Sequence, residues 1–583
     1  MSKHRLPSAP VPPLKRAHFL QPSSSSSAPV STTFDDAFYD ELILSIFSFL
    51  GSTDLCAIQA TNSNWARLAS DNQLWKALYL RDYGRPRLRG GRGFVGRADG
   101  REVKPLPGRA KPDNLKDWKW MYRISSNWRS GRCSVENMNT PVDLALSQTS
   151  EVPRSLPRTR TDKTHVLLAG SLTIVAQSDS CLRPSLYVHG GAVATHKLVC
   201  RSTFHNTLTR ITALALDQSP PNKPCQPSLR PSHHIRLVAL LSTGEFSVFN
   251  LDYTTPSSNS SPKLAYVPSS TTRSLSAPIT HAAYHHPVLV TLSDSFVLTI
   301  YDLSNDSVSL VQTLTSFTSH PPSSLVLSAM PTLGTYKLVL AYAVPVYPAH
   351  WSVGATELII SHSNTMSPSS SHPFDSTTSG LTAPSGPLEV STTRTARAFD
   401  VPQGWIDERK LETIREQWGR KVTQVADTQT DGKWVVLAPG DTPHTSPPSS
   451  SSNPHTSPQP TAHSTIATAH HSPTHLQLYR LHLPSSSGVS HTPKLSFVRT
   501  LHGPIGPVSA LALADGRCVS LGVNGGIWVW DLEGSDTGGA VVASPISLNM
   551  EESELVEKGT VVFDERRIVS AGVRGVELRR FDV

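Results

Sequence analysis

The spacing of apolar residues changes at about residue 133, and this change limits the folds that the 583-residue chain can adopt. From Phe34 to Arg132, apolar residues recur at three- and four-residue steps, as in amphipathic helices. After residue 133 they form short runs between polar, Pro-rich or Ser-rich segments, as in strands and loops. The sequence therefore predicts an α+β multidomain protein with a small all-α part followed by a larger all-β part.

Several segments contain too few apolar residues to offset the entropy cost of ordering. Residues 1–32 are rich in Pro, Ser and basic residues, and we expect a disordered tail there. We expect low-complexity insertions near 254–278, 362–397 and 440–474. The sequence has no run of about 18 apolar residues and no apolar signal-peptide core, which predicts a protein without a membrane partner.

Four short helices are expected in the all-α part. The first covers Phe38–Leu50 and ends at Gly51, the second follows Asp54, and the third carries Trp65. A capping-box pattern at residues 70–73 opens the fourth. Apolar residues spread around the first helix more widely than one neighbouring helix can cover. This pattern predicts an exposed apolar surface that a protein partner covers.

Residues 34–84 resemble an F-box, the module through which substrate receptors of cullin-RING ubiquitin ligases bind a Skp-type adaptor. The matching residues are Glu41-Leu42, Ile46 to Leu50, Asp54-Leu55, Trp65, Leu68-Ala69 and Leu74 to Lys76. Family members usually open with Leu-Pro, whereas this sequence has Phe38-Tyr39, which keeps the hydrophobic anchor and loses the proline. The resemblance implies adaptor binding by Phe38, Leu42, Ile43, Ile46, Phe47, Leu50, Leu55, Trp65, Leu74 and Trp75.

Residues 85–132 are predicted to form a basic linker and a linker helix. Between Lys76 and Arg132 there are 16 Lys or Arg and five Asp or Glu, so the positive charge of the chain is local. The stretch 85–111 has the charge to attract nucleic acid, but a solvated linker is the simpler interpretation. A helix is expected over about 113–128. The segment 127–131, Asn-Trp-Arg-Ser-Gly, resembles one that leads into the first propeller strand of F-box proteins with WD repeats.

Residues 133–583 are predicted to form a divergent β-propeller with seven WD-repeat-like blades. His502–Glu533 resembles a WD repeat, and weaker units end at Phe249, Tyr301 and Phe581. Three less regular groups lie near 165–190, 324–361 and 422–483. Such units bury their sheets only by stacking in a ring, and we expect the last strand to pair with an early strand. A β-sandwich or two unrelated β domains is the alternative.

The acidic residue that WD repeats usually place six positions before the Trp is absent from three units. Asn524, Thr243 and Gly575 stand there. The usual polar network is then missing, and we expect the ring to be held together mainly by apolar packing between blades.

No sequence motif indicates catalysis or a bound cofactor. Gly91, Gly93 and Gly96 match a dinucleotide fingerprint without the strand and helix that it requires. Six histidines between 444 and 475 lie in a Ser-, Thr- and Pro-rich segment without ligand spacing, and no Cys-x-x-Cys pair is present. We predict no catalytic residue, no metal and no cofactor.

The resemblance implies a non-catalytic substrate-recognition subunit of an SCF-type ubiquitin ligase, in the cytoplasm, the nucleus or both. Its propeller would bind a target protein, phosphorylated in some receptors of this kind because a guanidinium group fits phosphate oxygens. Arg574 and Arg210 are the candidate target-binding residues. The alternative is a WD-repeat scaffold with a vestigial F-box and no role in ubiquitination.

Overall fold

The computed structural model describes two compact units, which divide between Leu78 and Tyr79. The described residues are 34–84, 117–138, 163–190, 193–203, 207–219, 234–252, 262–268, 277–304, 307–346, 350–363, 386–399, 404–440, 475–483, 493–534, 538–546 and 558–583. The predicted tail and the predicted insertion at 440–474 therefore lie almost wholly outside the described residues.

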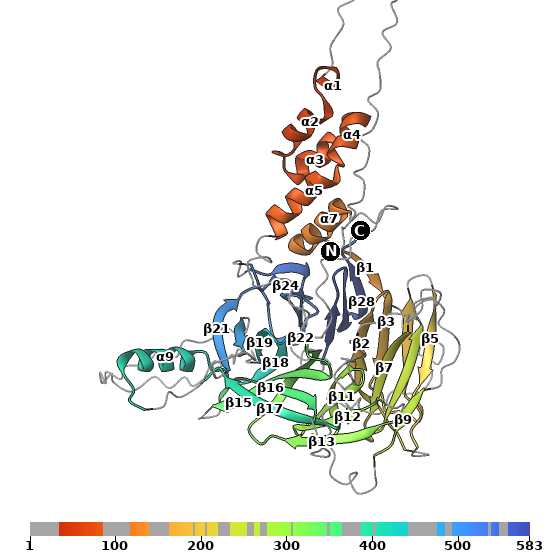
Figure 1. Cartoon of the computed structure of the whole chain (residues 1–583), viewed down its shortest axis with the longest axis vertical. Coiled ribbons are helices and arrows are strands. Elements are labelled where there is room, and N and C mark those ends of the chain that lie inside the picture. The colour runs from red at the N-terminus through yellow and green to blue at the C-terminus, as the bar shows by residue number, and fades with distance from the viewer. Residues whose placement is uncertain are drawn as a thin grey trace, which may run out of the picture. The chain divides into compact units, whose positions relative to one another are not determined.

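The first unit is a bundle of short helices. They are α1 (Phe34–Ala37), α2 (Asp40–Phe47), α3 (Ser52–Ile58), α4 (Ser63–Ala69) and α5 (Asn72–Tyr79) (Figure 1). The prediction that the first helix runs from Phe38 to Leu50 is wrong at both ends, and Gly51 is the N-cap of α3. The predicted cap of the fourth helix is one residue early. Asp71 accepts the Gln73 amide at 2.7 Å, whereas Ser70 donates its hydroxyl to the Ala66 carbonyl.

The second unit contains seven four-stranded antiparallel sheets, so the predicted seven-bladed propeller is confirmed (Figure 1). Blade 1 consists of β2 (Thr164–Ala169), β3 (Leu172–Gln177), β4 (Ser185–Gly190) and β5 (Val193–Val199). Blade 2 consists of β6 (Ile211–Leu216), β7 (His234–Leu241), β8 (Phe246–Asp252) and β9 (Leu264–Tyr266). Blade 3 consists of β10 (Ile279–His285), β11 (Val288–Ser293), β12 (Val297–Asp302) and β13 (Ser309–Thr315).

Blades 4 to 6 continue the same order. Blade 4 consists of β14 (His320–Ala329), β15 (Thr335–Val346), β16 (His350–His362) and β17 (Leu388–Arg397). Blade 5 consists of β18 (Val425–Thr430), β19 (Trp434–Pro439), β20 (Leu476–His482) and β21 (Lys494–Leu501). Blade 6 consists of β22 (Val508–Ala514), β23 (Arg517–Gly522), β24 (Ile527–Asp531) and β25 (Ala540–Ala543).

Blade 7 joins the two ends of the propeller sequence. Its strands are β26 (Thr560–Phe563), β27 (Arg567–Gly572), β28 (Gly575–Arg580) and, from the other end, β1 (Ser134–Asn137). β1 pairs antiparallel with β28, from Ser134 opposite Arg580 to Asn137 opposite Glu577. The prediction that the last strand pairs with an early one is confirmed, and the β-sandwich alternative is excluded.

Two of the predicted insertions contain strands. Residues 388–397, placed in a low-complexity insertion, form β17, the outer strand of blade 4. Residues 264–266 form β9 in blade 2. Their Ser, Thr and charged residues fit an outer strand, because one of its faces and one of its edges meet solvent. The helix α9 (Glu408–Gly419), between blades 4 and 5, is not predicted by the sequence analysis.

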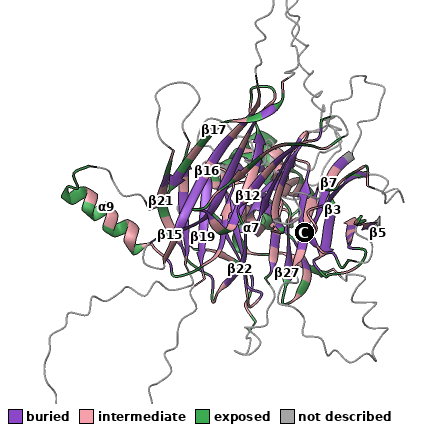
Figure 2. Cartoon of the chain, turned by 90° about the horizontal axis from the view of Figure 1, so that it is seen from below, coloured by how far each residue is buried: buried purple, intermediate pink, exposed green. Residues whose placement is uncertain are grey.

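Apolar cores lie between neighbouring blades, and buried residues run along most strands (Figure 2). Polar contacts also cross these boundaries, beside the apolar packing that the sequence predicts as the main contribution. The Asp427 carboxylate of blade 5 accepts the Leu511 amide of blade 6 at 2.7 Å. Glu245 accepts the hydroxyls of Ser202 and Thr203 and joins blade 2 to the connection before it.

The two faces of the propeller have different connections. We call one of them the connection face: it carries the links between blades and the turns between the second and third strands of each blade. The innermost strand of every blade begins on this face. The opposite face carries the turns between first and second strands and between third and fourth strands.

The helix α7 (Trp118–Ser130) packs on the opposite face, directly before β1. The Trp128 ring stacks on Phe581 with centroids 4.0 Å apart, and its indole N–H donates to the Glu565 carbonyl at 2.9 Å. A side chain at Gly131, which has a φ of 72°, would collide with the Val541 carbonyl. The predicted helix start near residue 113 is wrong, because Asp117 is the N-cap.

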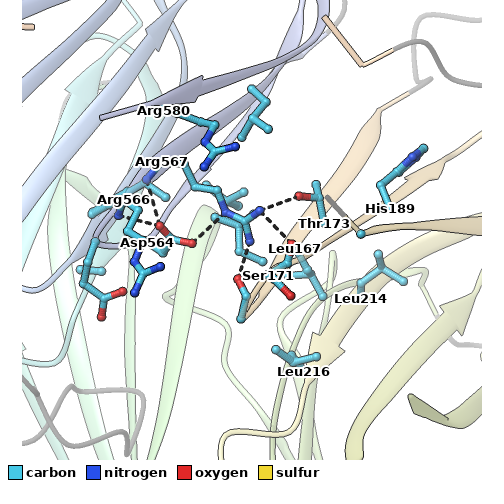
Figure 3. A pocket seen from close by; sticks show the side chains of 18 of the residues that line it. Leu167, Ser171, Thr173, His189, Leu214, Leu216, Asp564, Arg566, Arg567 and Arg580 are labelled. Carbon is cyan, nitrogen blue, oxygen red and sulfur yellow. Dashed lines mark hydrogen bonds and ion pairs between the residues drawn. The ribbon is translucent and has the colours of Figure 1, made fainter. Parts of the chain in front are cut away.

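Arg567 links blade 7 to blade 1, and we predict that its loss destabilises the ring. Its guanidinium donates to the Gly170, Leu172 and Thr173 oxygens and pairs with Asp564 at 2.9 Å (Figure 3). Arg567→Met removes the donor for these acceptors, two of which belong to the buried residues Leu172 and Thr173, and should cost about 2–4 kcal/mol. Thermal unfolding should show a clearly lower melting temperature than for Arg132→Met, a change at an exposed arginine. Equal melting temperatures would contradict this role.

Candidate protein-interaction surfaces

The helical unit exposes a group of large apolar side chains, which we call the helical apolar patch. It consists of Phe34, Phe38, Tyr39, Leu42, Ile46 and Phe49. Tyr39 is 79% exposed and Phe49 is 85% exposed, values that are unusual for large apolar residues of an ordered bundle. A group of exposed apolar side chains within one short segment of sequence is a candidate site of protein interaction.

Helical geometry separates the exposed and buried residues of α2. Leu42 and Ile46 are four residues apart, so they lie on one side of the helix, and both are about half exposed. Ile43 and Phe47 have the same spacing one position later and point into the bundle, where Ile43 is 0% exposed. One short helix therefore supplies both the core and the patch.

The ten residues predicted to bind an adaptor divide between the core and the surface. Phe38, Leu42 and Ile46 are exposed, and Leu50 and Trp65 are partly exposed. The remaining five are buried, so the structure assigns them to the core and not to a contact surface: Ile43, Phe47, Leu55, Leu74 and Trp75. The predicted set omits Phe34, Tyr39 and Phe49, because three- and four-residue periodicity selects the packed face of a helix.

Aromatic contacts hold part of the patch in place. The rings of Phe34 and Phe38 lie 4.7 Å apart, and Phe34 also meets the edge of Trp65 at 5.7 Å. Trp65 in turn contacts the buried Phe47 ring. The patch is therefore supported from the core, and Phe38 is placed without the proline that usually precedes the first helix.

The two arginines predicted to bind a target both lie on the connection face, but the structure does not bring them together. Arg574 is in the turn between β27 and β28 in blade 7, and Arg210 precedes β6 in blade 2, with blade 1 between them. Arg574 is partly buried and donates to the Ser544 carbonyl. Its guanidinium therefore links two parts of the ring and is not held ready for a phosphate.

Titratable residues of four blades gather near the axis on the connection face. Lys163 precedes β2 and Lys558 precedes β26, in neighbouring blades. Both positive charges lower the pKa of His281, which burial lowers more strongly, to about 3. Both also act on Asp427, whose pKa burial raises. Sequence analysis misses this group because its members are spread along the sequence from Lys163 to Lys558.

A cavity of about 1020 Å³ opens on the opposite face (Figure 3). Leu167, Leu214 and Leu216 line one side, and Arg566, Arg567 and Arg580 line the other. The arginines already have partners: Arg567 holds backbone carbonyls of blade 1, Arg580 pairs with Asp582, and Arg566 lies over the Trp120 ring. The cavity wall is therefore internally neutralised and does not favour a charged ligand.

Within the described ranges, no group of three or more His, Cys, Asp or Glu side chains is arranged to hold a metal ion. The glycines at 91, 93 and 96 and the histidine segment before 475 lie outside these ranges. None of the helices in the described part of the chain has the length and apolar character needed to cross a membrane.

Comparison with known proteins identifies the helical unit. Residues 40–81 match the F-box-like family model, so the chain contains an F-box-like domain at the predicted position. No curated protein that was compared matches the chain.

Solved structures similar to the chain are β-propellers of low sequence identity. The WD40 propeller domain of Doa1 is 10% identical, with a TM-score of 0.33, over 72% of this chain and 94% of that one. The C-terminal WD40 domain of Sif2 is 9% identical, with a TM-score of 0.33, over 72% and 82%. These scores are low, so the propeller assignment depends on the strand pairing described above. The chain therefore combines an F-box-like domain with a seven-bladed β-propeller.

Ile43 and Ile46 allow a matched test of the division between core and patch. Ile43→Ala removes fully buried atoms and should destabilise the helical unit by about 2–4 kcal/mol. Ile46→Ala removes atoms that are 46% exposed and should change stability by less than about 1 kcal/mol. Native-state hydrogen exchange of the α2–α5 amides measures both. Equal losses would contradict the assignment of Ile46 to the patch.

Proposed function

We propose that the protein is a non-catalytic substrate-recognition subunit of an SCF-type ubiquitin ligase. The helical apolar patch binds a Skp-type adaptor, the adaptor links the chain to a cullin-RING core, and the propeller binds the target. The observation that carries the proposal is the apolar patch on a domain of the F-box-like family, because F-box domains generally bind such adaptors.

Burial of the patch supplies the free energy for docking. Apolar surface removed from water contributes roughly 25 cal/mol per Å². Phe38, Tyr39, Leu42, Ile46 and Phe49 together offer aromatic and aliphatic side chains of the type that dominates protein interfaces. Because the buried residues Ile43 and Phe47 already hold α2 in place, little ordering of its backbone opposes binding.

The contribution of such a receptor to catalysis is positioning. A target held on the propeller experiences a raised local concentration of the ubiquitin-charged enzyme. The contacts of α7 with Glu565 and Phe581 fix the linker helix to the propeller, so the chain before β1 cannot swing freely at that point. A linker helix fixed to the propeller supports a receptor role, because such a receptor must hold the target at a suitable distance from the ubiquitin-charged enzyme.

We place the protein in the cytoplasm or nucleus as part of this proposal. Five cysteines are free in the described part of the chain, and Cys200 and Cys518 among them are buried. Unpaired cysteines are typical of reducing compartments. The rival function, a scaffold without a role in ubiquitination, is favoured by the Phe38-Tyr39 opening in place of Leu-Pro.

A double substitution in the patch separates the two functions. Leu42→Asp with Ile46→Asp places two charges in the proposed interface and leaves the bundle core intact, so co-purification with the Skp-type adaptor and cullin should be lost. Phe47 is unsuitable for such a substitution because it is 3% exposed, and its replacement by Asp would unfold the bundle. Circular dichroism checks that the variant stays folded.

Leu333→Asp is the matched control, because Leu333 is an exposed apolar residue of the propeller. This variant should retain the adaptor and cullin. Adaptor recovery that is the same for the double variant and the wild type contradicts docking through the patch. Failure of the wild type to recover either protein favours the scaffold.

A further inference from the structure

The helix α9 exposes apolar side chains outside the ring of blades (Figure 1, Figure 2). It has 12 residues and none of them is buried. Trp405, just before the helix, is 87% exposed, and Ile406 and Leu411 are 46% and 40% exposed. A helix of this length is only marginally stable in water unless one of its faces packs against something. The exposed side chains of α9 are therefore a candidate contact surface.

Contacts with the propeller hold the C-terminal end of α9. The Trp418 ring contacts Phe399, which follows blade 4, with centroids 5.7 Å apart. The Arg420 guanidinium lies 4.6 Å from the centre of the Phe497 ring in blade 5. The Arg420 carbonyl also accepts the side-chain amide of Gln477 at 2.8 Å. The propeller therefore sets the direction of α9, so a partner meets a helix that is already in place.

The apolar residues of α9 have the spacing of a helix-pairing seam. Leu411, Ile414 and Trp418 are three and four residues apart, which is the a–d–a spacing of a heptad. Ile414 and Trp418 are half-buried and Leu411 is exposed. A stripe as narrow as this one fits one second helix and not a broad apolar surface.

Charged residues beside the seam indicate the direction of the second helix. Glu408 and Arg415 fall at e positions of the heptad, and Lys410 falls at a g position. An antiparallel second copy of α9 places each Glu408 beside Arg415 of the other copy, so twofold symmetry makes this pair twice. A parallel copy would instead place Lys410 beside Arg415, which are like charges. The helix dipoles also favour the antiparallel direction.

The charges of α9 are complementary to α9 itself. Residues 407–421 contain four acidic and five basic residues, so this surface does not favour a strongly charged partner. The ion pair within α9 joins Arg420 to Glu416 at 3.9 Å, whereas Glu408 and Arg415 have no ion-pair partner among the described residues. Both members of the intermolecular pair are therefore present on one copy and available for the other.

We propose that α9 pairs with α9 of a second copy of the chain in an antiparallel contact with twofold symmetry. Leu411 of each copy packs against Ile414 of the other, and Trp405 and Ile406 lie against Trp418 of the other. Two helices of this length bury less than the roughly 1,200–2,000 Å² of a stable interface, so the dimer is weak and reversible. The helical apolar patch takes no part in the contact, so the inference is independent of the proposed receptor function.

Sedimentation equilibrium of the full chain, from about 1 to about 200 µM, measures the dimer. The wild type should show a reversible monomer–dimer equilibrium with a Kd in the micromolar range. Leu411→Glu places two charges in the seam and should weaken the dimer about tenfold or more. Thr413→Glu adds the same charge on the other side of α9 and should change the Kd by less than about twofold. A wild type that is monomeric at every concentration overturns the proposal, as does an equal effect of the two variants.

Charge reversal tests the antiparallel direction. Glu408→Arg or Arg415→Glu alone places like charges together at both symmetric positions and should weaken the dimer several-fold. The two changes in one chain restore opposite charges and should recover most of the affinity. A double variant as weak as the single ones overturns the antiparallel pairing.

A further variant excludes dimerisation through the helical unit. Leu42→Asp with Ile46→Asp changes the helical apolar patch and should leave the dimer as in the wild type. A dimer that this variant loses and that Leu411→Glu keeps is formed by the patch, and this result also overturns the proposal. Circular dichroism checks that each variant stays folded.

Discussion

Pairing of β1 with β28 is the constraint on which the propeller depends. Four residues near the start of the second unit complete the outer strand of a blade whose other three strands lie at the end of the chain. Without this pairing, β28 would present an unpaired edge, and no hydrogen-bonded strand from the other end of the propeller sequence would complete the last blade. Arg567 reinforces the closure at the next boundary, where its guanidinium donates to four backbone or side-chain oxygens of blade 1. β1, the strand that closes the ring, follows α7 directly in the chain, so the linker helix α7 is attached to blade 7.

The two units use apolar surface in opposite ways. The propeller buries the apolar faces of its strands against neighbouring blades, and few large apolar residues of its strands remain exposed. The helical unit is too small to bury all of its apolar residues and keeps a patch in solvent. An exposed patch has a cost in solubility, so its presence on an ordered helix is most simply explained by a partner that covers it.

Much of this architecture is predictable from the sequence, because the change in apolar periodicity and the seven strand groups are local signals. The helical bundle, the seven blades and the pairing of the last strand with an early one are confirmed. The site residues are less predictable. Ile43 and Ile46 are the same residue type three positions apart, and only the packing of the bundle distinguishes the core residue from the exposed one. Lys163 and Lys558 become neighbours only when the ring closes, so no spacing along the chain indicates them.

The outer strands show a second limit. β17 consists largely of Thr, Ser and charged residues, a composition that sequence analysis assigns to a disordered insertion, yet pairing with β16 orders it. The helix α9 is a similar case, since Asp407 caps it locally and none of its residues is buried. β17 buries only a few apolar residues, Leu388 and Ala396 among them, and both elements gain much of their order from backbone or capping hydrogen bonds, which the apolar pattern does not reveal.

Hydrogen exchange of the full chain, with and without a purified Skp-type adaptor, tests the central claim most directly. The account predicts slower exchange of the amides in residues 34–50 on adaptor binding and unchanged exchange in the strands of blades 1 to 6. Binding that leaves residues 34–50 unprotected, or that protects the propeller strands in their place, would contradict it.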